Sequence, residues 1–299
     1  MRHLRLGASL YVPATRADLL RLGGGSLRSV IYCTEDAVAD PDLDSALANL
    51  RQALPLLPAA GPLRFIRPRN PLVLESLLAM PGIENIDGFV LPKVTCRTLP
   101  RYLGALAGDS RFDLMPTIET EEAFDAREMR RLRSLLLGSA AYPRILTLRV
   151  GGNDLMRTLG IRRPRHGTIY ETALGPLMAQ IVATFRPAGF NLTAPVFEGL
   201  ADEGLLRAEV ERDLAYGFFG KAAVHPDQIP VIEVGYAVHR QDLTMAKELL
   251  ESDAPAVFRM YDTMCEVATH SGWAATILAR AEVYGIVDEE PVRLVALPR

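Results

Sequence analysis

Short apolar segments alternate along the chain with stretches whose apolar residues recur at helical spacing. The segments are rich in β-branched and aromatic residues and have the length of buried strands. They predict eight strands, at residues 8–13, 29–34, 63–67, 86–92, 113–118, 144–150, 191–197 and 217–224. Strands separated by helical patterns are typical of βαβ units and a parallel α/β sheet. Eight of them, beginning almost at residue 1, favour a closed (β/α)8 TIM barrel over an open sheet.

The segment after residue 226 contains no further clear strand. Residues 241–252 and 255–283 have the apolar spacing of helices, which predicts a barrel domain over 1–240 and a C-terminal helical extension over 241–299. One helix layer already covers a barrel, so we expect the apolar side of the extension to pack across a homo-oligomer interface. The alternative is that it folds back onto its own barrel. The apolar residues concerned are Met245, Leu249, Leu250, Val257, Phe258, Met260, Met264, Val267, Trp273, Ile277 and Leu278.

Composition indicates a globular protein and argues against nucleic-acid-binding, disulfide-rich and membrane-spanning classes. The chain has 299 residues, is 49% hydrophobic and has a formal net charge of -3, so it is long enough for one barrel and lacks the basic excess of a nucleic-acid-binding protein. Its three cysteines are widely spaced and form neither a disulfide framework nor a Cys-x-x-Cys metal site. No run reaches the ~20 apolar residues of a membrane span. We therefore expect a cytoplasmic protein with no nucleic-acid and no membrane partner.

Two carboxylates that follow predicted strands are the strongest candidates for chemistry. Glu119 comes directly after 113–118, and Asp154 follows 144–150 after a Gly151-Gly152 turn. Because the C-terminal ends of barrel strands meet at one mouth, the two side chains should lie close together. Carboxylate oxygens are the ligands that Mg2+ prefers, so the pattern predicts a Mg2+ site, although helix capping would also account for either residue. Gly152 either brings the backbone close to the substrate or simply forms the turn.

Two arginines end the third predicted strand at the same mouth. Arg67 and Arg69 are two residues apart, hence on one face of a regular strand. A guanidinium offers a planar fork that suits a carboxylate, so both are candidate substrate contacts. Pro68 weakens the strand between them, and we favour Arg67 as the ligand-facing residue. Solvated surface arginines are the alternative.

Further charged residues follow the second, fourth and eighth predicted strands. Glu35 and Asp36 are candidates to bind substrate, orient a metal-bound water or pair with an arginine. Lys93 and Lys221 are two of only three lysines in the chain, and both are candidate substrate contacts. His225, which precedes a proline, either moves a proton or fixes the turn into the next helix.

A set of short motifs follows these strands in a fixed order. They are Leu10-Tyr-Val-Pro-Ala14, Thr34-Glu-Asp-Ala-Val38, Phe65-Ile-Arg67, Gly88-Phe-Val-Leu-Pro-Lys-Val94, Ile118-Glu-Thr120, Gly152-Asn-Asp-Leu155 and Gly220-Lys-Ala-Ala-Val-His-Pro-Asp-Gln-Ile229. In this order, across about residues 7–235, the chain resembles the citrate lyase beta-subunit family within the HpcH/HpaI aldolase group. Its opening, Gly7 to Thr15, is similar to an offshoot of carbon–carbon bond lyases found near tellurium-resistance and stress genes.

The resemblance implies a Mg2+-dependent barrel that cleaves or forms a C–C bond next to an oxo-acid or acyl thioester. It assigns the metal carboxylates to Glu119 and Asp154 and the substrate arginine to Arg67. Two departures from the family pattern matter. Cys33 replaces the first acid of Asp-Leu-Glu-Asp-Ala-Val, and Arg69 replaces the asparagine of Arg-x-Asn, which puts the familiar substrate in doubt. Coenzyme A thioester lyases of the group also use a C-terminal acid from a neighbouring subunit, for which the candidates here are Asp288, Glu289 and Glu290.

We therefore predict a metal-dependent aldol- or Claisen-type lyase acting on a small oxo-acid, hydroxy-acid or acyl thioester, including those of coenzyme A. The metal would stabilise charge on a substrate oxygen, Arg67 would hold a carboxylate or thioester carbonyl, and Glu35, Asp36 or His225 would move the proton. One alternative is a Schiff-base aldolase that uses Lys93 or Lys221. The other is a barrel that binds a small acid or a partner protein without catalysis.

Overall fold

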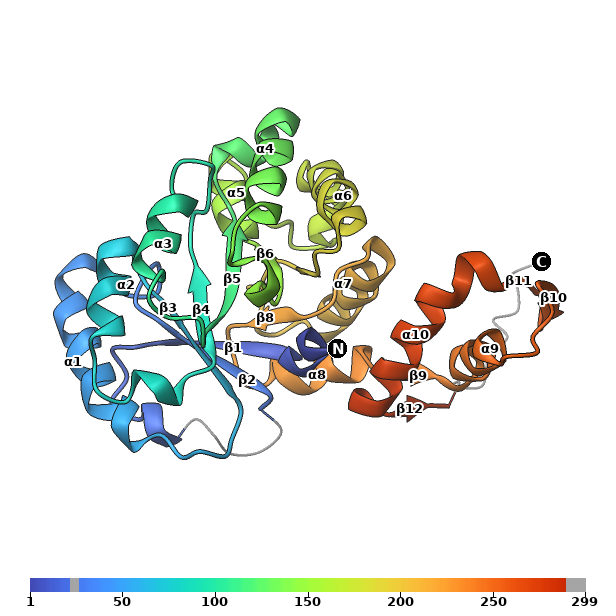
Figure 1. The fold of residues 1–299 in the computed structure, drawn as a ribbon, viewed down its shortest axis with the longest axis horizontal. Coiled ribbons are helices and arrows are strands. Elements are labelled where there is room, and N and C mark those ends of the chain that lie inside the picture. Colours follow the sequence, from blue (N-terminus) through green and yellow to red (C-terminus); the bar gives the residue numbers. More distant parts are fainter. Residues whose placement is uncertain (22–26, 289–299) are drawn as a thin grey trace. The chain divides into compact units, whose positions relative to one another are not determined.

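The computed structural model describes residues 1–21 and 27–288 (Figure 1). The chain divides into a barrel unit, Arg2–Ile232, and a second unit that begins at Glu233 and also includes Met1. The division falls before residue 240 because Val238 belongs to the core of the second unit. No helix in residues 1–21 and 27–288 is long and apolar enough to cross a membrane.

Eight parallel strands of the described chain form one sheet in the order β7-β6-β5-β4-β3-β2-β1-β8. An isolated parallel bridge between Ala194 and Lys221 joins β7 to β8, so the sheet closes on itself and the predicted (β/α)8 barrel is confirmed. The strands are β1 (Ala8–Pro13), β2 (Ser29–Cys33), β3 (Leu63–Arg67), β4 (Gly88–Leu91), β5 (Asp113–Ile118), β6 (Leu148–Val150), β7 (Leu192–Thr193) and β8 (Lys221–Ala223).

The last strands are shorter than predicted, for local reasons. Pro195 has no N–H to continue the ladder beyond the end of β7. Gly217 and Gly220 both have a φ of +91°, a left-handed conformation that keeps 217–220 out of the sheet. The bounds of β1, β3 and β5 agree with the sequence prediction.

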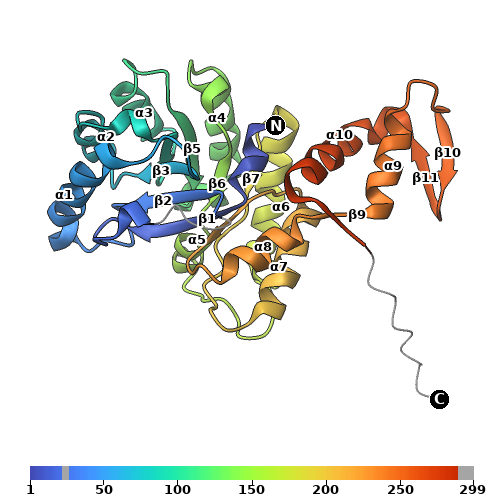
Figure 2. The ribbon, with the colours of Figure 1, turned by 90° about the horizontal axis from the view of Figure 1, so that it is seen from below.

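Helices follow the strands and cover the outside of the barrel (Figure 2). Side-chain caps explain where several of them begin: Asn70, Asp125 and Asp202 each accept a hydrogen bond from a backbone N–H of the first turn. The helices are α1 (Leu43–Ala53), α2 (Pro71–Leu78), α3 (Leu99–Ala105), α4 (Ala126–Leu137), α5 (Gly152–Thr158), α6 (Leu174–Phe185), α7 (Glu203–Tyr216) and α8 (Gln228–Gly235).

The barrel interior changes from apolar to polar along the strands. A buried apolar layer contains Ile31, Phe65 and Met115, on β2, β3 and β5. Side chains two residues apart on a strand share a face, so the next inward positions are Cys33, Arg67 and Thr117, followed by Glu119 just beyond β5. The packed layer closes the barrel below, and the polar layer faces the mouth formed by the C-terminal strand ends.

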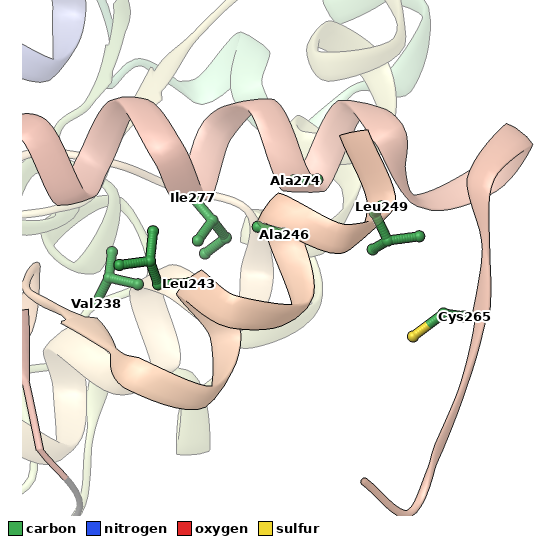
Figure 3. Packing of buried hydrophobic residues seen from close by; sticks show 7 residues of the cluster. All are labelled: Val238, Leu243, Ala246, Leu249, Cys265, Ala274 and Ile277. Carbon is green, nitrogen blue, oxygen red and sulfur yellow. The ribbon is translucent and has the colours of Figure 1, made fainter. Parts of the chain in front are cut away.

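The second unit has a small core of its own (Figure 3). It contains α9 (Arg240–Leu250), a hairpin of β10 (Val257–Met260) and β11 (Thr263–Glu266), α10 (Val267–Tyr284), and the parallel pair β9 (Val238–His239) and β12 (Ile286–Val287). The prediction of one helix over 255–283 and of no strand after residue 226 was wrong. Phe258 and Met260 alternate with exposed residues, a period of two that suits a strand, and Tyr261 turns the chain with a φ of +51°.

This core explains much of the apolar pattern of the C-terminal segment. Its buried members, labelled in Figure 3, are Val238, Leu243, Ala246, Leu249, Cys265, Ala274 and Ile277. The partly buried Met245, Phe258, Met260, Val267 and Leu278 pack against them. Most of the apolar residues that we expected at a subunit interface therefore pack within the unit. Four of the predicted set stay largely exposed: Leu250, Val257, Met264 and Trp273.

Candidate active site

A cavity of about 420 Å3 lies at the C-terminal ends of the barrel strands. Its wall draws on strands β1, β2, β3, β5, β6 and β8 and on the turn between β6 and α5. It includes five of the residues that the sequence nominated for the site, which are Asp36, Arg67, Glu119, Gly152 and Asp154. Among its lining residues are Tyr11, Cys33, Asp36, Arg67, Thr117, Glu119, Arg149, Gly151, Gly152, Asp154, Arg157, Val196 and Ala222.

Glu119 lies at the base of the mouth and is almost completely buried. Its two carboxylate oxygens accept hydrogen bonds from Arg67 Nη2 at 3.0 and 3.1 Å, and Oε1 also accepts one from the backbone N of Lys93 at 2.8 Å. A Cβ on Gly151 would lie 2.3 Å from Glu119 Oε2, so only glycine lets the chain after β6 pass this close to the carboxylate. Burial raises the pKa of Glu119, Arg67 opposes the rise and Asp154 adds to it.

Asp154 enters the same cavity from the first turn of α5. Its Oδ1 accepts a hydrogen bond of 2.6 Å from Arg157 Nη2 at the rim. Burial raises the pKa of Asp154, and the charge of Asp36 raises it further. Glu119 and Asp154, the carboxylate pair, thus sit in a site where negative charge is unfavourable.

This arrangement fits a hard divalent cation. A cation between the carboxylate pair would relieve the repulsion that raises the pKa of Glu119, and carboxylate oxygens are ligands that suit Mg2+. Within the described residues, no group of three or more His, Cys, Asp or Glu side chains is placed to hold a metal ion. Mg2+ commonly takes only one or two protein carboxylates and completes its octahedron with water and substrate oxygens, so two carboxylates suffice.

Arg67 also forms ion pairs with two other acidic residues of the mouth, Glu35 and Asp36. Its Nη2 lies 2.7 Å from Glu35 Oε2 and 3.1 Å from Asp36 Oδ2, in addition to its contacts with Glu119. Lys93 Nζ pairs with Glu35 and lies 3.1 Å from Asp36 Oδ1. We call these residues the Arg67 cluster, which consists of the cations Arg67 and Lys93 and the carboxylates Glu35, Asp36 and Glu119. Its members come from the C-terminal ends of β2, β3, β4 and β5.

The two neighbouring acids of this cluster have pKa values on opposite sides of their ordinary range. Burial raises the pKa of Glu35 to about 7, against the opposing charge of Arg67. Burial would also raise the pKa of Asp36, but the hydrogen bond with Glu35 and the charges of Arg67 and Lys93 lower it to about 2. A pair separated in this way provides one group that exchanges protons near neutral pH and one that stays ionised.

Lys93 has a structural role through its backbone. Its φ of +51° is unusual for a residue with a side chain, and it accompanies the hydrogen bond from Lys93 N to Glu119. The side chain contacts the acids of the Arg67 cluster and is not part of the cavity wall.

Arg69 and His225 do not line the cavity. The Arg69 guanidinium donates to the backbone oxygens of Thr34 and Val38 and pairs with Asp40, so it braces the chain after β2. The His225 side chain is half exposed, and its Nδ1 accepts a hydrogen bond from the backbone N of Asp227 at 3.3 Å. Their contacts favour the structural interpretation of both residues.

The expectation that Lys221 lies at the mouth was wrong. Lys221 opens β8 and is completely buried on the outer side of the sheet, where Nζ lies 2.9 Å from Glu209 Oε1 and 3.0 Å from Asp213 Oδ2 of α7. Tyr170 completes the site by donating a 2.6 Å hydrogen bond to Asp213 Oδ1. Side chains alternate along a strand, so it is the next residue, Ala222, that reaches the cavity.

Gly152 and Asp288 are two further predicted residues that the structure describes. Gly152 lines the cavity, and a Cβ there would lie 2.7 Å from Pro195 Cβ, so close packing of the turn already requires glycine. Asp288 pairs with Arg240 on the exposed surface of the second unit. Glu289 and Glu290 lie outside the described residues.

The sequence interpretation missed Arg149. It lies in the middle of β6, lines the cavity and is only 3% exposed. The sequence does contain a signal for it, which is an arginine inside an otherwise apolar strand. Such a charged residue in a barrel must either point inward to a ligand or have a buried partner.

Comparison with known proteins gives a family and several relatives. A family model described as C-C_Bond_Lyase of the TIM-Barrel fold matches residues 1–286. A (3S)-malyl-CoA thioesterase of Cereibacter sphaeroides is 25% identical over 244 residues, which is 79% of each chain. A citrate lyase subunit beta-like protein of Deinococcus radiodurans is 26% identical over 267 residues, covering 85% of this chain and 88% of the relative.

Solved structures share the fold at lower identity. CitE of Mycobacterium tuberculosis, in complex with magnesium, acetoacetate and coenzyme A, has a TM-score of 0.69 and 22% identity and covers 93% of this chain and 99% of its own. RipC of Yersinia pestis has a TM-score of 0.60 and 21% identity, with 78% and 95% covered.

Proposed function

The chain belongs to the C–C bond lyase family of the TIM-barrel fold, and we propose that its barrel is a Mg2+-dependent lyase for a small oxo-acid, hydroxy-acid or acyl thioester. The predicted resemblance to the citrate lyase beta-subunit family is confirmed, and the chain is an enzyme. The link of its offshoot to tellurium-resistance genes stays a prediction.

One observation carries the proposal: the carboxylate pair and Arg67 line one cavity at the strand ends. Mg2+, when bound, would supply stabilisation of the negative charge that develops on a substrate oxygen as the C–C bond breaks. Arg67 orients Glu119 by charge-assisted hydrogen bonds and Glu35 by an ion pair. Glu35 does not itself line the cavity, but it contacts Arg67 and the backbone of Asp36, which do, and its pKa, raised to about 7 by burial, suits a group that exchanges protons with the site near neutral pH.

The names of relatives support the substrate class. Relatives include a malyl-CoA thioesterase and an L-malyl-CoA/beta-methylmalyl-CoA lyase, and related structures carry acetoacetate with coenzyme A or oxaloacetate. We propose that this chain likewise acts on a small carboxylic acid, free or as a coenzyme A thioester. Arginines in the cavity suit the carboxylate of either form.

The Schiff-base alternative is less consistent with the lysines. A lysine nucleophile needs a lowered pKa. Burial would lower the pKa of Lys93, but its hydrogen bond to Glu35 and the charges of Glu35 and Asp36 raise it. The pKa of Lys221 is likewise raised, since Asp213 and Glu209 outweigh its burial. Both amines are held as ammonium ions.

A homo-oligomer remains part of the proposal. Met264 and Val257 lie on the outer side of the β10–β11 hairpin, 59% and 55% exposed, with Trp273 and Leu250 as further exposed apolar residues of the same unit. Covering such residues by a second copy would remove apolar surface from water. Light scattering at micromolar concentration should give a multiple of the 32.8 kDa chain mass, and a monomer would contradict this part of the proposal.

Isotope-edited NMR tests the reaction. Uniformly 13C-labelled oxo-acids, hydroxy-acids and malyl-CoA would be incubated with the protein and Mg2+, and cleavage would appear as loss of one-bond 13C–13C coupling at the broken bond. The expected result is cleavage of at least one compound that stops when EDTA removes the metal. Cleavage that continues in EDTA would contradict the metal-dependent mechanism.

A further inference from the structure

We propose that Arg149 forms a second anion site, deeper in the cavity than the carboxylate pair, that binds a carboxylate group of the ligand. The inference rests on the proposed function, because it says how the protein orients the substrate of that cavity, through the substrate's carboxylate. It also assigns this task to Arg149 and leaves Arg67 to position the acidic residues.

Arg149 carries a buried charge without a counter-charge. It is 3% exposed and lines the cavity from β6. Within the described residues its guanidinium makes one hydrogen bond, from Nη1 to Met115 Sδ at 3.9 Å, and its Cζ lies 5.5 Å from the centroid of the Tyr11 ring. No carboxylate of the described chain lies within ion-pair distance of it. A buried cation normally has an anionic partner, so this geometry leaves room for an anion from outside.

Two hydroxyl groups stand beside Arg149 in the same row of the barrel. Thr117 of β5 and Thr193 of β7 are its register partners on the two neighbouring strands. In the described residues, the Oγ1 atoms of both threonines are buried without a hydrogen-bond partner. Hydroxyls donate as well as accept, and a guanidinium only donates. Arg149 and Thr117 both line the cavity, so a guanidinium and an unpartnered hydroxyl on adjacent strands face it, which suits a carboxylate; Thr193 continues the row on β7 but is not part of the cavity wall.

The Nη2 atom of Arg67 is occupied by comparison, while the Nε atom is buried without a hydrogen-bond partner in the described residues. The Nη2 atom already lies between 2.7 and 3.1 Å from oxygens of Glu35, Asp36 and Glu119. A substrate carboxylate at Arg67 would meet three carboxylates that already contact its Nη2, whereas no carboxylate of the described residues forms an ion pair with Arg149. Both guanidinium groups face the Tyr11 ring, with Cζ distances of 5.8 and 5.5 Å from its centroid. A small acid anchored at Arg149 therefore lies within the same cavity as the carboxylate pair, and we expect its reacting carbonyl to face that pair.

Ligand binding without metal tests this site. The probe is pyruvate in EDTA, measured by isothermal titration, with neutral pyruvamide and sodium chloride at matched ionic strength as controls. Wild-type protein should bind pyruvate in preference to pyruvamide. Arg149→Met removes the charge and keeps a side chain that packs against Met115, and it should weaken pyruvate binding by about 10- to 100-fold. Arg69→Met, a matched arginine outside the cavity wall, should bind pyruvate like the wild type.

Melting temperature separates a binding role from a structural one. Replacing an unpaired buried cation by an apolar side chain should raise the melting temperature of the ligand-free Arg149→Met protein. Unchanged pyruvate affinity in Arg149→Met would overturn the proposal, as would equal binding of pyruvate and pyruvamide by the wild type. If Arg149→Met does not fold, the same titration is made with Arg149→Lys. This variant keeps the positive charge but loses the two-pronged guanidinium, so its affinity for pyruvate should fall about tenfold. Unchanged affinity there overturns the proposal.

These outcomes are independent of the metal proposal. The titration contains no Mg2+ and measures no turnover, so Arg149 can bind the carboxylate even if the carboxylate pair binds no metal. Conversely, Glu119 and Asp154 can bind the metal even if pyruvate affinity does not depend on Arg149.

Discussion

Two charge clusters on opposite sides of the barrel wall both contain buried cations and carboxylates, but their surroundings differ. The Arg67 cluster surrounds a cation with carboxylates at the mouth, and Arg67 and two of its acids line the cavity. The Lys221 cluster (Lys221, Glu209 and Asp213) places an ammonium between two carboxylates behind β8, with side chains 0–1% exposed. Burial and ion pairing alone therefore do not distinguish a reactive site from a structural one.

Charge balance and satisfied hydrogen bonds do distinguish them. In the Lys221 cluster the two acids are matched by Lys221 and by Arg163, which pairs with Glu209, and Tyr170 donates to Asp213. The Arg67 cluster has three carboxylates against two cations, whereas Arg149, in the wall of the same cavity, has no ion pair within the described residues. Charges that are unevenly paired beside an accessible cavity are what a metal ion or an anionic ligand would neutralise.

The largest expected effect tests the structural side of this comparison. Lys221→Met leaves Glu209 and Asp213 buried without their common cation, which should lower the free energy of unfolding by about 3–5 kcal/mol, as measured by urea denaturation. Adding Glu209→Gln and Asp213→Asn removes the stranded charges and should restore most of the loss. If Lys221→Met alone keeps wild-type stability, the Lys221 cluster does not stabilise the fold, and the comparison with the Arg67 cluster fails.

A smaller effect should appear in the pH dependence of stability. The pKa of Glu35 is about 7 in the folded protein and has an ordinary value of 4.5, so the folded state binds the extra proton between these values. Unfolding free energy should therefore fall as pH rises from about 4.5 to 7 and then level off. Glu35→Gln should show a smaller decline, as measured by urea denaturation across the range, because Asp213, Glu119 and Asp154, whose pKa values burial also raises, still contribute. A decline of equal size in the variant would assign the ionisation near pH 7 to another group.

The smallest expected effect concerns the lysine beside the cavity. With its pKa raised, Lys93 should form no imine with an oxo-acid, so borohydride reduction should leave the protein mass unchanged. Lys93→Met is the matched control for any background adduct. A stable adduct in the wild type that is absent from Lys93→Met would restore the Schiff-base mechanism.

The sequence predicted the barrel and much of the site, because both depend on local patterns. Apolar segments of strand length marked β1, β3 and β5 within their observed bounds, and acids just after strands marked Glu119 and Asp154. It could not tell which side of β8 Lys221 faces, because one residue of register reverses the side chain. It also missed the 257–266 hairpin, whose apolar residues fit helical spacing until their burial in the second unit is known.

Arg149 illustrates a different limit. Its identity as a charged residue within β6 is visible in the sequence, but its lack of a counter-charge is a property of three strands together. Only the register of β5, β6 and β7 reveals that two unpartnered hydroxyls flank it. Sequence patterns identify inward positions, whereas the balance of charge within a cavity requires the assembled barrel.

Titration of metal-free protein with Mg2+ by calorimetry tests the central claim most directly. We expect a single Mg2+ to bind the wild type, and Glu119→Gln and Asp154→Asn each to weaken that affinity by at least about 100-fold, since each removes one of two protein ligands. Asp213→Asn, a buried acid of the Lys221 cluster, is the matched control and should bind Mg2+ like the wild type. Wild-type affinity in both Glu119→Gln and Asp154→Asn would contradict the assignment of the metal to this cavity.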